Sequence, residues 1–256
     1  MFRVAIPARL DSTRFPAKVL APLAGRAMIE HVHDLARRSG AAEVVIATDS
    51  ERVRSACAAF GAQVELTAAE HPSGTDRIAE LARRRGWADD SIVVNVQADE
   101  PLLPPALIDQ VAALLAADAG ADIATLQTPI TAIGDYLDPN VVKVVGRADG
   151  RALYFSRAPI PWNRDAAPEG LASQRDYRGS RRHIGIYAYR LGVLQRLAAS
   201  RPSALEQLER LEQLRALQTG LAIAIADACE MPGPGVDTAA DLERVERLLA
   251  GSPRRP

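Results

Sequence analysis

The sequence predicts an α/β fold in which a mostly parallel sheet is flanked by helices. Three observations lead to this prediction. Short β-branched runs alternate with longer segments of helical period, at least one of the strand-like runs is apolar at nearly every position, and no Gly/Ser linker or 20-to-50-residue repeat divides the chain. Together they favour one domain in which helices cover both faces of the sheet.

The first half of the chain alternates strands with helices. Strands are expected where β-branched and other apolar residues form short runs, at 2–6, 43–48, 63–66, 91–96 and 122–126. Helices are expected where apolar residues recur at i, i+3, i+4 and i+7, at 27–38, 51–60, 75–85 and 105–117. In such a βαβ series the ligand crevice lies beyond the carboxyl ends of the strands.

The second half of the chain is mixed. Strands are expected at 141–145, 152–155, 184–189 and 222–226, and helices at 191–199, 204–219 and 238–250. The polar stretch 161–182 is rich in Arg, Asp, Gly and Ser, which favours a mobile loop. We expect a single domain over residues 1–251 with a smaller mixed β lobe, followed by a tail at 252–256.

The charge balance excludes several classes of partner. With 31 basic against 32 acidic residues, there is no electrostatic reason to expect a nucleic-acid binder or an anionic-membrane binder. A small molecule is the expected partner.

The sequence also indicates a location. Cys57 and Cys229 form no C-x-x-C motif and are interpreted as reduced thiols, and no run of 18 apolar residues or signal peptide is present, so we expect a cytoplasmic protein.

Common nucleotide and metal motifs are missing. Neither lysine follows a glycine or precedes Ser or Thr, since Val19 follows Lys18 and Val144 follows Lys143, which excludes a Walker A loop. The first strand is not followed by G-x-G-x-x-G, the four histidines form no zinc signature, and there is no G-x-S-x-G nucleophile motif.

A basic loop follows the first strand instead. Arg9, Arg14 and Lys18 fall within ten residues, separated by small and hydroxyl residues. Such a loop can direct backbone N–H groups and cations toward a triphosphate, although a solvated basic loop is the alternative. Lys18 favours the phosphate interpretation, because 29 of the 31 basic residues are Arg and a lysine suggests a position that needs a compact ammonium.

Two carboxylates are candidate metal ligands. Asp99 ends an apolar strand and should lie in the crevice opposite the basic loop, where a carboxylate would repel a nucleotide unless a divalent cation lay between them. We therefore expect Mg²⁺, a hard ion held by one or two carboxylates, phosphate oxygens and water. Asp237 precedes the last helix and is a second candidate, with helix capping by Asp237 or Thr238 as the alternative.

The segment 71–77 begins the third helix. Its hydroxyls and free N–H groups could recognise a base or a ribose, with ordinary helix capping as the alternative. Arg77 is the more informative residue of this segment.

These motifs resemble a known family. The residues that carry the resemblance are PAR at 7–9, STR at 12–14, P-x-K at 16–18, SGTDR at 73–77, VNVQADEP at 94–101, YFSR at 154–157, HIGIY at 183–187, LEQLR at 211–215 and GVDT at 235–238. In this order they resemble the CMP-KDO synthetases, the 3-deoxy-manno-octulosonate cytidylyltransferases, from about residue 2 to 249. The resemblance implies a Rossmann-like nucleotidyltransferase fold, a homodimer, and transfer of CMP from CTP to 3-deoxy-D-manno-octulosonate (KDO) for lipopolysaccharide biosynthesis.

The resemblance also implies residue roles. It gives Ala8, Arg9, Arg14 and Lys18 to the nucleotide and phosphate loop, Ser73, Arg77 and Gln97 to cytosine and ribose, and Asp99 and Asp237 to magnesium. It gives Arg157, His183, Tyr187, Glu212 and Gln213 to the sugar-acid pocket. Arg9, Lys18 and Asp99 are the expected catalytic residues, with a CTP half at about 1–130 and a sugar-acid and dimerisation lobe at about 131–220 inserted before the final metal motif and helix.

Several points stay open. Tyr187 could be an ordinary strand residue, Glu212 could only pair with Arg215, and Lys143 could line the acceptor side or cover a strand edge. The family usually has Gly where this chain has Ala17 and Ala98, which would be strained at positive φ.

The expected mechanism is in-line displacement at the α-phosphorus of CTP without a covalent enzyme intermediate. No general base is identified; a metal-lowered pKa of the attacking hydroxyl is the favoured substitute, and His183 is the less favoured one. A related acidic sugar, or a catalytically silent nucleotide-binding domain, are the alternatives.

Overall fold

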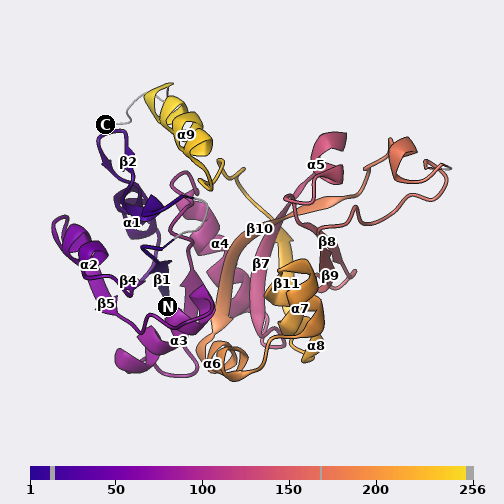
Figure 1. Cartoon of the computed structure of the whole chain (residues 1–256). Helices are drawn as coiled ribbons and strands as arrows, with labels where there is room; N and C mark the ends of the chain where they lie inside the picture. Colours follow the sequence, from indigo (N-terminus) through magenta and orange to yellow (C-terminus); the bar gives the residue numbers. More distant parts are fainter. Residues whose placement is uncertain (12–14, 168, 252–256) are drawn as a thin grey trace.

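The computed structural model describes residues 1–11, 15–167 and 169–251. Its main sheet has the strand order β11-β7-β10-β6-β1-β4-β5, with β8 and β9 added beside β10 (Figure 1). The strands are β1 (Phe2–Ala8), β4 (Glu43–Thr48), β5 (Gln63–Leu66), β6 (Ile92–Asn95), β7 (Ile123–Pro129), β8 (Lys143–Gly146), β9 (Ala152–Ser156), β10 (Arg181–Arg190) and β11 (Ile223–Asp227). A separate hairpin joins β2 (Pro22–Leu23) to β3 (Arg26–Ala27).

The sheet is mixed, with β10 as its antiparallel centre. β5, β4, β1 and β6 are parallel to one another, and β7 is parallel to β11. β10 lies between these two groups and pairs antiparallel with both, so that Tyr187 lies opposite Asn95 on β6 and Thr125 on β7. The predicted mostly parallel sheet is confirmed, while the strand predicted at 184–189 is longer than expected.

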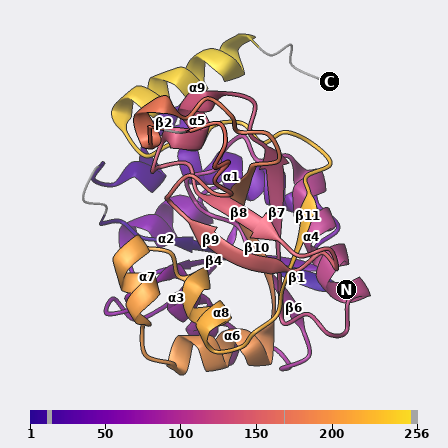
Figure 2. The ribbon, with the colours of Figure 1, turned by 90° about the vertical axis from the view of Figure 1, so that its right-hand side faces the viewer.

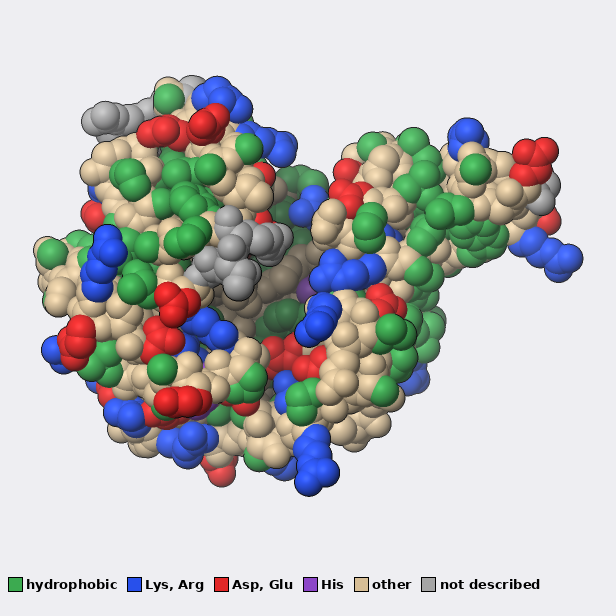
Figure 3. Space-filling view, in the orientation of Figure 1, with side chains coloured by type: hydrophobic (Ala, Val, Ile, Leu, Met, Phe, Trp, Pro, Cys, Tyr) green, Lys and Arg blue, Asp and Glu red, His purple; other side chains and the backbone are tan. Residues whose placement is uncertain are grey.

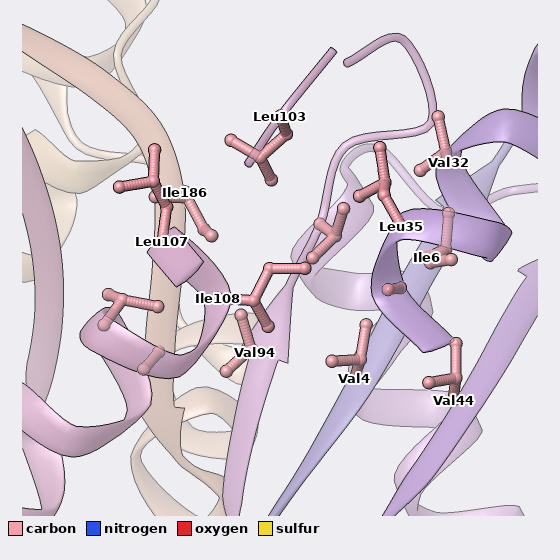
Figure 4. Packing of buried hydrophobic residues seen from close by; sticks show 14 of the residues in the cluster. Val4, Ile6, Val32, Leu35, Val44, Val94, Leu103, Leu107, Ile108 and Ile186 are labelled. Atoms are coloured by element: carbon pink, nitrogen blue, oxygen red, sulfur yellow. The ribbon is translucent and has the colours of Figure 1, made fainter. Parts of the chain in front are cut away.

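Helices cover both faces of the sheet, as expected. They are α1 (Met28–Arg37), α2 (Glu51–Ala58), α3 (Gly74–Arg84), α4 (Pro105–Ala117), α5 (Ile133–Leu137), α6 (Leu191–Ala199), α7 (Ala204–Glu209), α8 (Gln213–Gln218) and α9 (Ala239–Gly251). Alternate residues of β1 point to opposite faces of the sheet. Val4 and Ile6 pack with α1 and α4 (Figure 4), whereas Ala5 packs on the side of α3, α6 and α8. No helix of the described residues is long and apolar enough to cross a bilayer.

The prediction of one helix over 204–219 is wrong. The structure has two short helices there, because Arg210 takes a left-handed conformation with φ 54° and ends α7. The apolar period continues through the break: Leu205, Leu211 and Leu214 all pack against the core, whereas Leu208 is exposed. Periodicity alone therefore could not reveal the turn, and this turn carries Glu212 toward the sheet.

The lobe predicted at 131–220 is divided in the structure. β8, β9 and the segments 157–167 and 169–180 project from the body (Figure 1; seen end-on in Figure 2). The described part of the polar stretch contains only a short 3₁₀ turn (Leu171–Ser173) before β10 begins. β10, α6 and α8 instead belong to the main sheet and its core. Sequence pattern could not show this, because β10 joins strands that lie far from it in the chain.

Candidate active site

One cavity beyond the carboxyl end of β6 collects most of the predicted site residues. It has a volume of about 460 Å³ and lies between the parallel strands and the turn before α8; Figure 3 shows the surface hollowed between body and lobe. The predicted residues that line it are Gln97, Asp99, Arg157, His183, Tyr187, Glu212, Gln213 and Asp237. Residues predicted from the two halves of the chain thus meet at one site.

Lys18 and two carboxylates form one end of this site, which we call the phosphate end. The Nζ atom of Lys18 lies 2.7 Å from Oδ2 of Asp99 and 3.1 Å from Oδ1 of Asp237, and it donates to the carbonyl of Val236 at 2.9 Å. Burial lowers the pKa of Lys18, but the two carboxylates outweigh this effect and raise it above its ordinary value. Both carboxylates therefore converge on one cation position.

The conformation of Ala17 positions Lys18. Ala17 has φ 55°, and the 3₁₀ turn Lys18–Leu20 begins directly after it. A left-handed conformation costs a residue with a Cβ atom roughly 1–2 kcal/mol. The strain suspected where the family usually has Gly is therefore present at Ala17, whereas Ala98 is not among the described non-glycine residues with positive φ.

Thr238, rather than Asp237, caps the last helix. The hydroxyl of Thr238 accepts from the Asp241 amide at 3.2 Å, and the Asp241 carboxylate accepts from the Thr238 amide at 2.9 Å. The Asp237 carboxylate faces Lys18 instead. Thr238 therefore caps the helix, and Asp237 does not.

A second cavity of about 430 Å³ shares Asp99 and Asp237 and extends toward Arg182 and Arg244. Glu100 lines this second cavity and is close to Gly235, where an added Cβ would meet its Oε1 atom at 2.8 Å. Burial raises the pKa of Glu100 to about 7, and the charge of Asp99 adds to this shift.

Arg157 is the centre of the opposite end, which we call the sugar end. Its guanidinium donates to three main-chain carbonyls: Nε to Glu209 at 2.6 Å, Nη1 to Pro139 at 2.9 Å and Nη2 to Arg210 at 3.5 Å. A guanidinium has five N–H donors, so one on each Nη atom is left for a ligand. These two donors can bind a carboxylate from a fixed position.

His183 is half-buried and lines the cavity beside the sugar end. Its Nε2 atom lies 3.0 Å from Oγ1 of Thr125, and its ring packs against Phe155 and Tyr187 at centroid distances of 5.0 and 5.2 Å. Burial lowers the pKa of His183 to about 3, and nearby Arg182 contributes to the shift. The imidazole is therefore neutral and a poor proton acceptor at neutral pH, which argues against a general base role.

Two polar atoms in this cavity have no hydrogen-bond partner among the described residues. They are the hydroxyl oxygen of Tyr187 and Oδ1 of Asn95. Buried polar atoms in proteins are nearly always paired, so these two are positioned to contact a polar ligand. Tyr187 is thus a β10 residue that also lines the cavity, and its contact with the sugar stays a prediction.

Glu212 both pairs with Arg215 and faces the cavity, so its two predicted alternatives do not exclude each other. Its Oε1 atom lies 3.4 Å from Nη2 of Arg215, and the residue also lines the cavity. Burial raises the pKa of Glu212, while a hydrogen bond with Thr75 and the charge of Arg215 oppose the shift.

Sequence reasoning missed several residues of the cavity. They are Thr75, Asn95, Gly185, Tyr189 and Leu211. A signal existed for two of them: Asn95 is the polar residue in an otherwise apolar strand, and Tyr189 is two positions after Tyr187, on the same face of β10.

Two residues assigned to the base and ribose lie elsewhere. Ser73 caps α3, with its side chain accepting from the Asp76 amide at 3.2 Å. Arg77 is fully buried and donates to Asp49 at 2.6 Å and to Thr67 at 2.5 Å. Because its guanidinium is held inside the protein by this ion pair, the structure does not support the predicted contact of Arg77 with a nucleotide.

The rest of the basic loop is only partly described. Ala8 is buried at the end of β1, and Nη2 of Arg9 donates to the carbonyl of His71 at 2.7 Å. This bond attaches the loop to the segment that precedes α3. The prediction for Arg14 falls on a residue outside the described ones.

Lys143 neither lines the acceptor side nor covers a strand edge, which were the two predicted alternatives. It is fully buried, and Nζ donates to the carbonyls of Asp138, Val141 and Arg157 at 2.9, 2.6 and 2.7 Å. Burial lowers its pKa. Lys143 therefore holds the main chain beneath the sugar end instead of lining it or covering an edge.

Comparison with known proteins agrees with this geometry. The cytidylyltransferase family matches residues 4–223. The chain is 55% identical to the 3-deoxy-manno-octulosonate cytidylyltransferase of Thioalkalivibrio sulfidiphilus over 97% of this chain and 98% of that protein. It is 53% identical to that of Cellvibrio japonicus, with coverage of 97% and 98%.

Solved structures show the same relationship. A CMP:2-keto-3-deoxy-manno-octonic acid synthetase in complex with CTP has a TM-score of 0.86 at 40% identity, covering 97% of this chain and 98% of that one. A 4-diphosphocytidyl-2C-methyl-D-erythritol synthase shares the fold, with a TM-score of 0.61 at 15% identity and coverage of 97% and 98%. The chain belongs to the 3-deoxy-manno-octulosonate cytidylyltransferase family.

Proposed function

We propose that this enzyme activates KDO with CTP, giving CMP-KDO and pyrophosphate for lipopolysaccharide biosynthesis. The observation that carries the proposal is the continuity of the site: one cavity joins the Asp99 and Asp237 carboxylates to Arg157 and to unpaired polar atoms. A sugar acid needs a carboxylate partner and hydroxyl partners, and its attacking hydroxyl must reach a nucleotide phosphate. The two ends of the cavity offer these groups together.

The proposed reaction is an in-line displacement. The anomeric hydroxyl of the sugar attacks the α-phosphorus of CTP, a new P–O bond forms, and the bond to pyrophosphate breaks. Arg157 and Glu212 orient the sugar, while the Lys18 ammonium stabilises charge on the phosphoryl oxygens. Since His183 has a pKa of about 3, we assign it to orientation and not to proton removal.

Mg²⁺ is part of the proposal, with Asp99 and Asp237 as its protein ligands. The two carboxylates suit this ion because both already approach one cation, the Lys18 ammonium, at 2.7 and 3.1 Å. No cluster of three or more His, Cys, Asp or Glu residues suited to a metal occurs among the described residues, so phosphate oxygens and water would complete the shell. When bound, the ion neutralises phosphate charge as a Lewis acid.

Pyrophosphate release tests the proposal. Purified enzyme with CTP and KDO should release pyrophosphate in the presence of Mg²⁺ and should be inactive with EDTA. Parallel assays with a sialic acid and with an amino-substituted octulosonate identify the accepted sugar. CTP binding without turnover on any of these sugars would show a silent nucleotide-binding domain and refute the proposal.

We extend the proposal to a cytoplasmic homodimer. Both cysteines are free thiols, as in reducing compartments. The projecting lobe exposes Leu153, Trp162 and Leu171 by 56%, 41% and 57%, an apolar surface that suits a second copy. Light scattering should give twice the chain mass for the wild type and the chain mass for Trp162→Asp with Leu171→Asp; a monomeric wild type would refute the dimer.

A further inference from the structure

Glu209 lies outside the cavity but contacts the residues that form its sugar end. It is the last residue of α7, and its carboxylate is surrounded by donors from the end of β9. Ser156 Oγ lies 2.8 and 3.1 Å from its two oxygens, Tyr154 donates to it at 3.2 Å, and the Arg157 amide donates to it at 2.6 Å. Three donor groups thus converge on one carboxylate.

The main chain of Glu209 contacts Arg157 a second time. Its carbonyl accepts from Nε of Arg157 at 2.6 Å. Glu209 therefore holds Arg157 through both the backbone amide and the guanidinium. This double contact fixes the direction of the two N–H groups that Arg157 has left for a carboxylate.

The same residue begins the turn into the cavity. Arg210 follows with φ 54°, and the chain then reverses so that Glu212 and Gln213 line the cavity. A left-handed conformation at a residue with a Cβ atom persists only where its surroundings enforce it. The bonds of the Glu209 carboxylate to β9, together with the packing of Leu211 and Leu214, hold this turn against the sheet.

A carboxylate suits this position better than an amide. Every neighbour of the Glu209 side chain named above is a donor, and an ionised carboxylate only accepts. A glutamine would keep the shape, and the Ser156 and Tyr154 hydroxyls could accept from its NH₂ group, but it lacks the negative charge that strengthens the bonds from these donors. The arrangement is therefore sensitive to a change that barely alters volume.

We propose that Glu209 is a positioning residue for the acidic sugar. It fixes Arg157 relative to Glu212 and Gln213, and thereby sets the spacing between the carboxylate contact and the hydroxyl contacts of the sugar. This inference rests on the proposed function, because it concerns the acceptor of that reaction. Substitution of Glu209 should therefore change the KM for the sugar but not the KM for CTP, since the described residues of the phosphate end do not contact Glu209.

Steady-state kinetics of Glu209→Gln test the proposal, after wild-type turnover has been established. We expect the KM for KDO to rise about ten-fold, the loss typical of one charge-assisted hydrogen bond, with the KM for CTP within about two-fold of wild type. Glu209→Asp, which keeps the acceptor, should restore part of the loss. Gln207→Ala, an exposed residue of the same helix, serves as control and should resemble wild type.

Ser156→Ala gives a second test that does not depend on the folding of the Glu209 variant. It removes the hydroxyl shared by both oxygens of Glu209, so the KM for KDO should rise about three-fold, and the double variant should show less than the product of the single effects. Equal rises in both KM values, or an unchanged KM for KDO in Glu209→Gln, would overturn the proposal. A wild type without turnover would instead refute the proposed function.

Discussion

The two ends of the active site are built on different physical principles. At the phosphate end, loops from distant parts of the chain bring a lysine between two carboxylates, and formal charges determine the geometry. At the sugar end, Arg157 and Lys143 are held by main-chain carbonyls. Among the described residues, neither side chain forms a direct ion pair, so carbonyl groups set the direction of both cations.

The two lysines of this arginine-rich chain illustrate the difference. Lys18 has carboxylate partners and a raised pKa, whereas Lys143 has a lowered pKa and donates only to carbonyl groups within the described part of the chain. A compact ammonium suits both positions, because each must direct short bonds to three oxygens around one nitrogen. Lys18 therefore balances the charge of two carboxylates, whereas Lys143 holds the main chain in place.

The carboxylate pair should give the largest effect on catalysis. Asp99→Asn and Asp237→Asn should each lower kcat by about 10²–10³-fold, as removal of an electrostatic contact to the transferring phosphoryl group does, and each should weaken Mg²⁺ binding. Steady-state assays and titration with Mg²⁺ measure both effects. Asp241→Asn is the control, since it alters the cap of α9 and should reduce stability while preserving turnover; wild-type activity of the Asp237 variant would contradict this assignment.

Lys143→Met should reduce stability more than rate. The substitution leaves three carbonyls without their donor, which we expect to lower the free energy of unfolding by about 3 kcal/mol. Urea denaturation measures the change, and the KM for CTP should remain at the wild-type value. Unchanged stability with a large loss of turnover would mean that the sugar end depends on charge as the phosphate end does.

Lys18→Arg tests whether the phosphate end needs a compact cation. A planar guanidinium cannot occupy the position of Nζ between two carboxylates and a carbonyl, so kcat should fall about 30-fold, or about 2 kcal/mol. Thermal unfolding should show a folded protein. Near-normal turnover would indicate that any cation suffices there.

Glu80 links the segment before α3 to acid stability. Burial would raise its pKa, but hydrogen bonds from the Ala68 amide, His71 and Arg84 outweigh this effect and lower the pKa to about 2. A carboxyl with a lowered folded pKa stabilises the protein above its unfolded pKa, and this contribution disappears as the pH falls from about 4.5 to about 2. Compared with Glu80→Gln, the wild type should be about 2 kcal/mol more stable at pH 7 and should lose this advantage through that range in denaturation assays.

Ala17→Gly should produce the smallest effect, and it should be stabilising. Removing the Cβ atom relieves left-handed strain but increases the entropy of the unfolded chain, so we expect a net gain of about 0.5–1 kcal/mol. Ala98→Gly is the control, because the described residues with positive φ do not include Ala98 and glycine there should only destabilise. Differential scanning calorimetry measures both; a less stable Ala17 variant would show that the turn is not strained.

The sequence predicted the parallel part of the fold well, because its signals are local. β1, β4, β5 and β6 have short apolar runs, and the helices between them have clear apolar periods. β10 could be predicted as a strand but not placed, since its partners β6 and β7 are set by tertiary packing. The turn at Arg210 was missed because the leucine period does not change there.

Residues of the candidate site could be predicted from the sequence where the charge of a side chain itself indicates its chemistry. Asp99, Asp237, Arg157 and Glu212 do line one cavity, although their roles remain predictions. Arg77 was misinterpreted because its partner Asp49 lies on another loop, and sequence cannot reveal a buried ion pair between distant segments. Asn95 was missed although it is the polar residue of an otherwise apolar strand, because the sequence does not show that the cavity borders its face of β6.

The central position of β10 also affects how the chain is made. During synthesis, β1, β4, β5 and β6 are complete once Asn95 has emerged, but the free side of β6 has no partner until Arg181–Arg190 follows. An unpaired edge of this kind can pair with other chains. Nascent or truncated chains that end before β10 should therefore depend on chaperones, and the active site can form only late in folding.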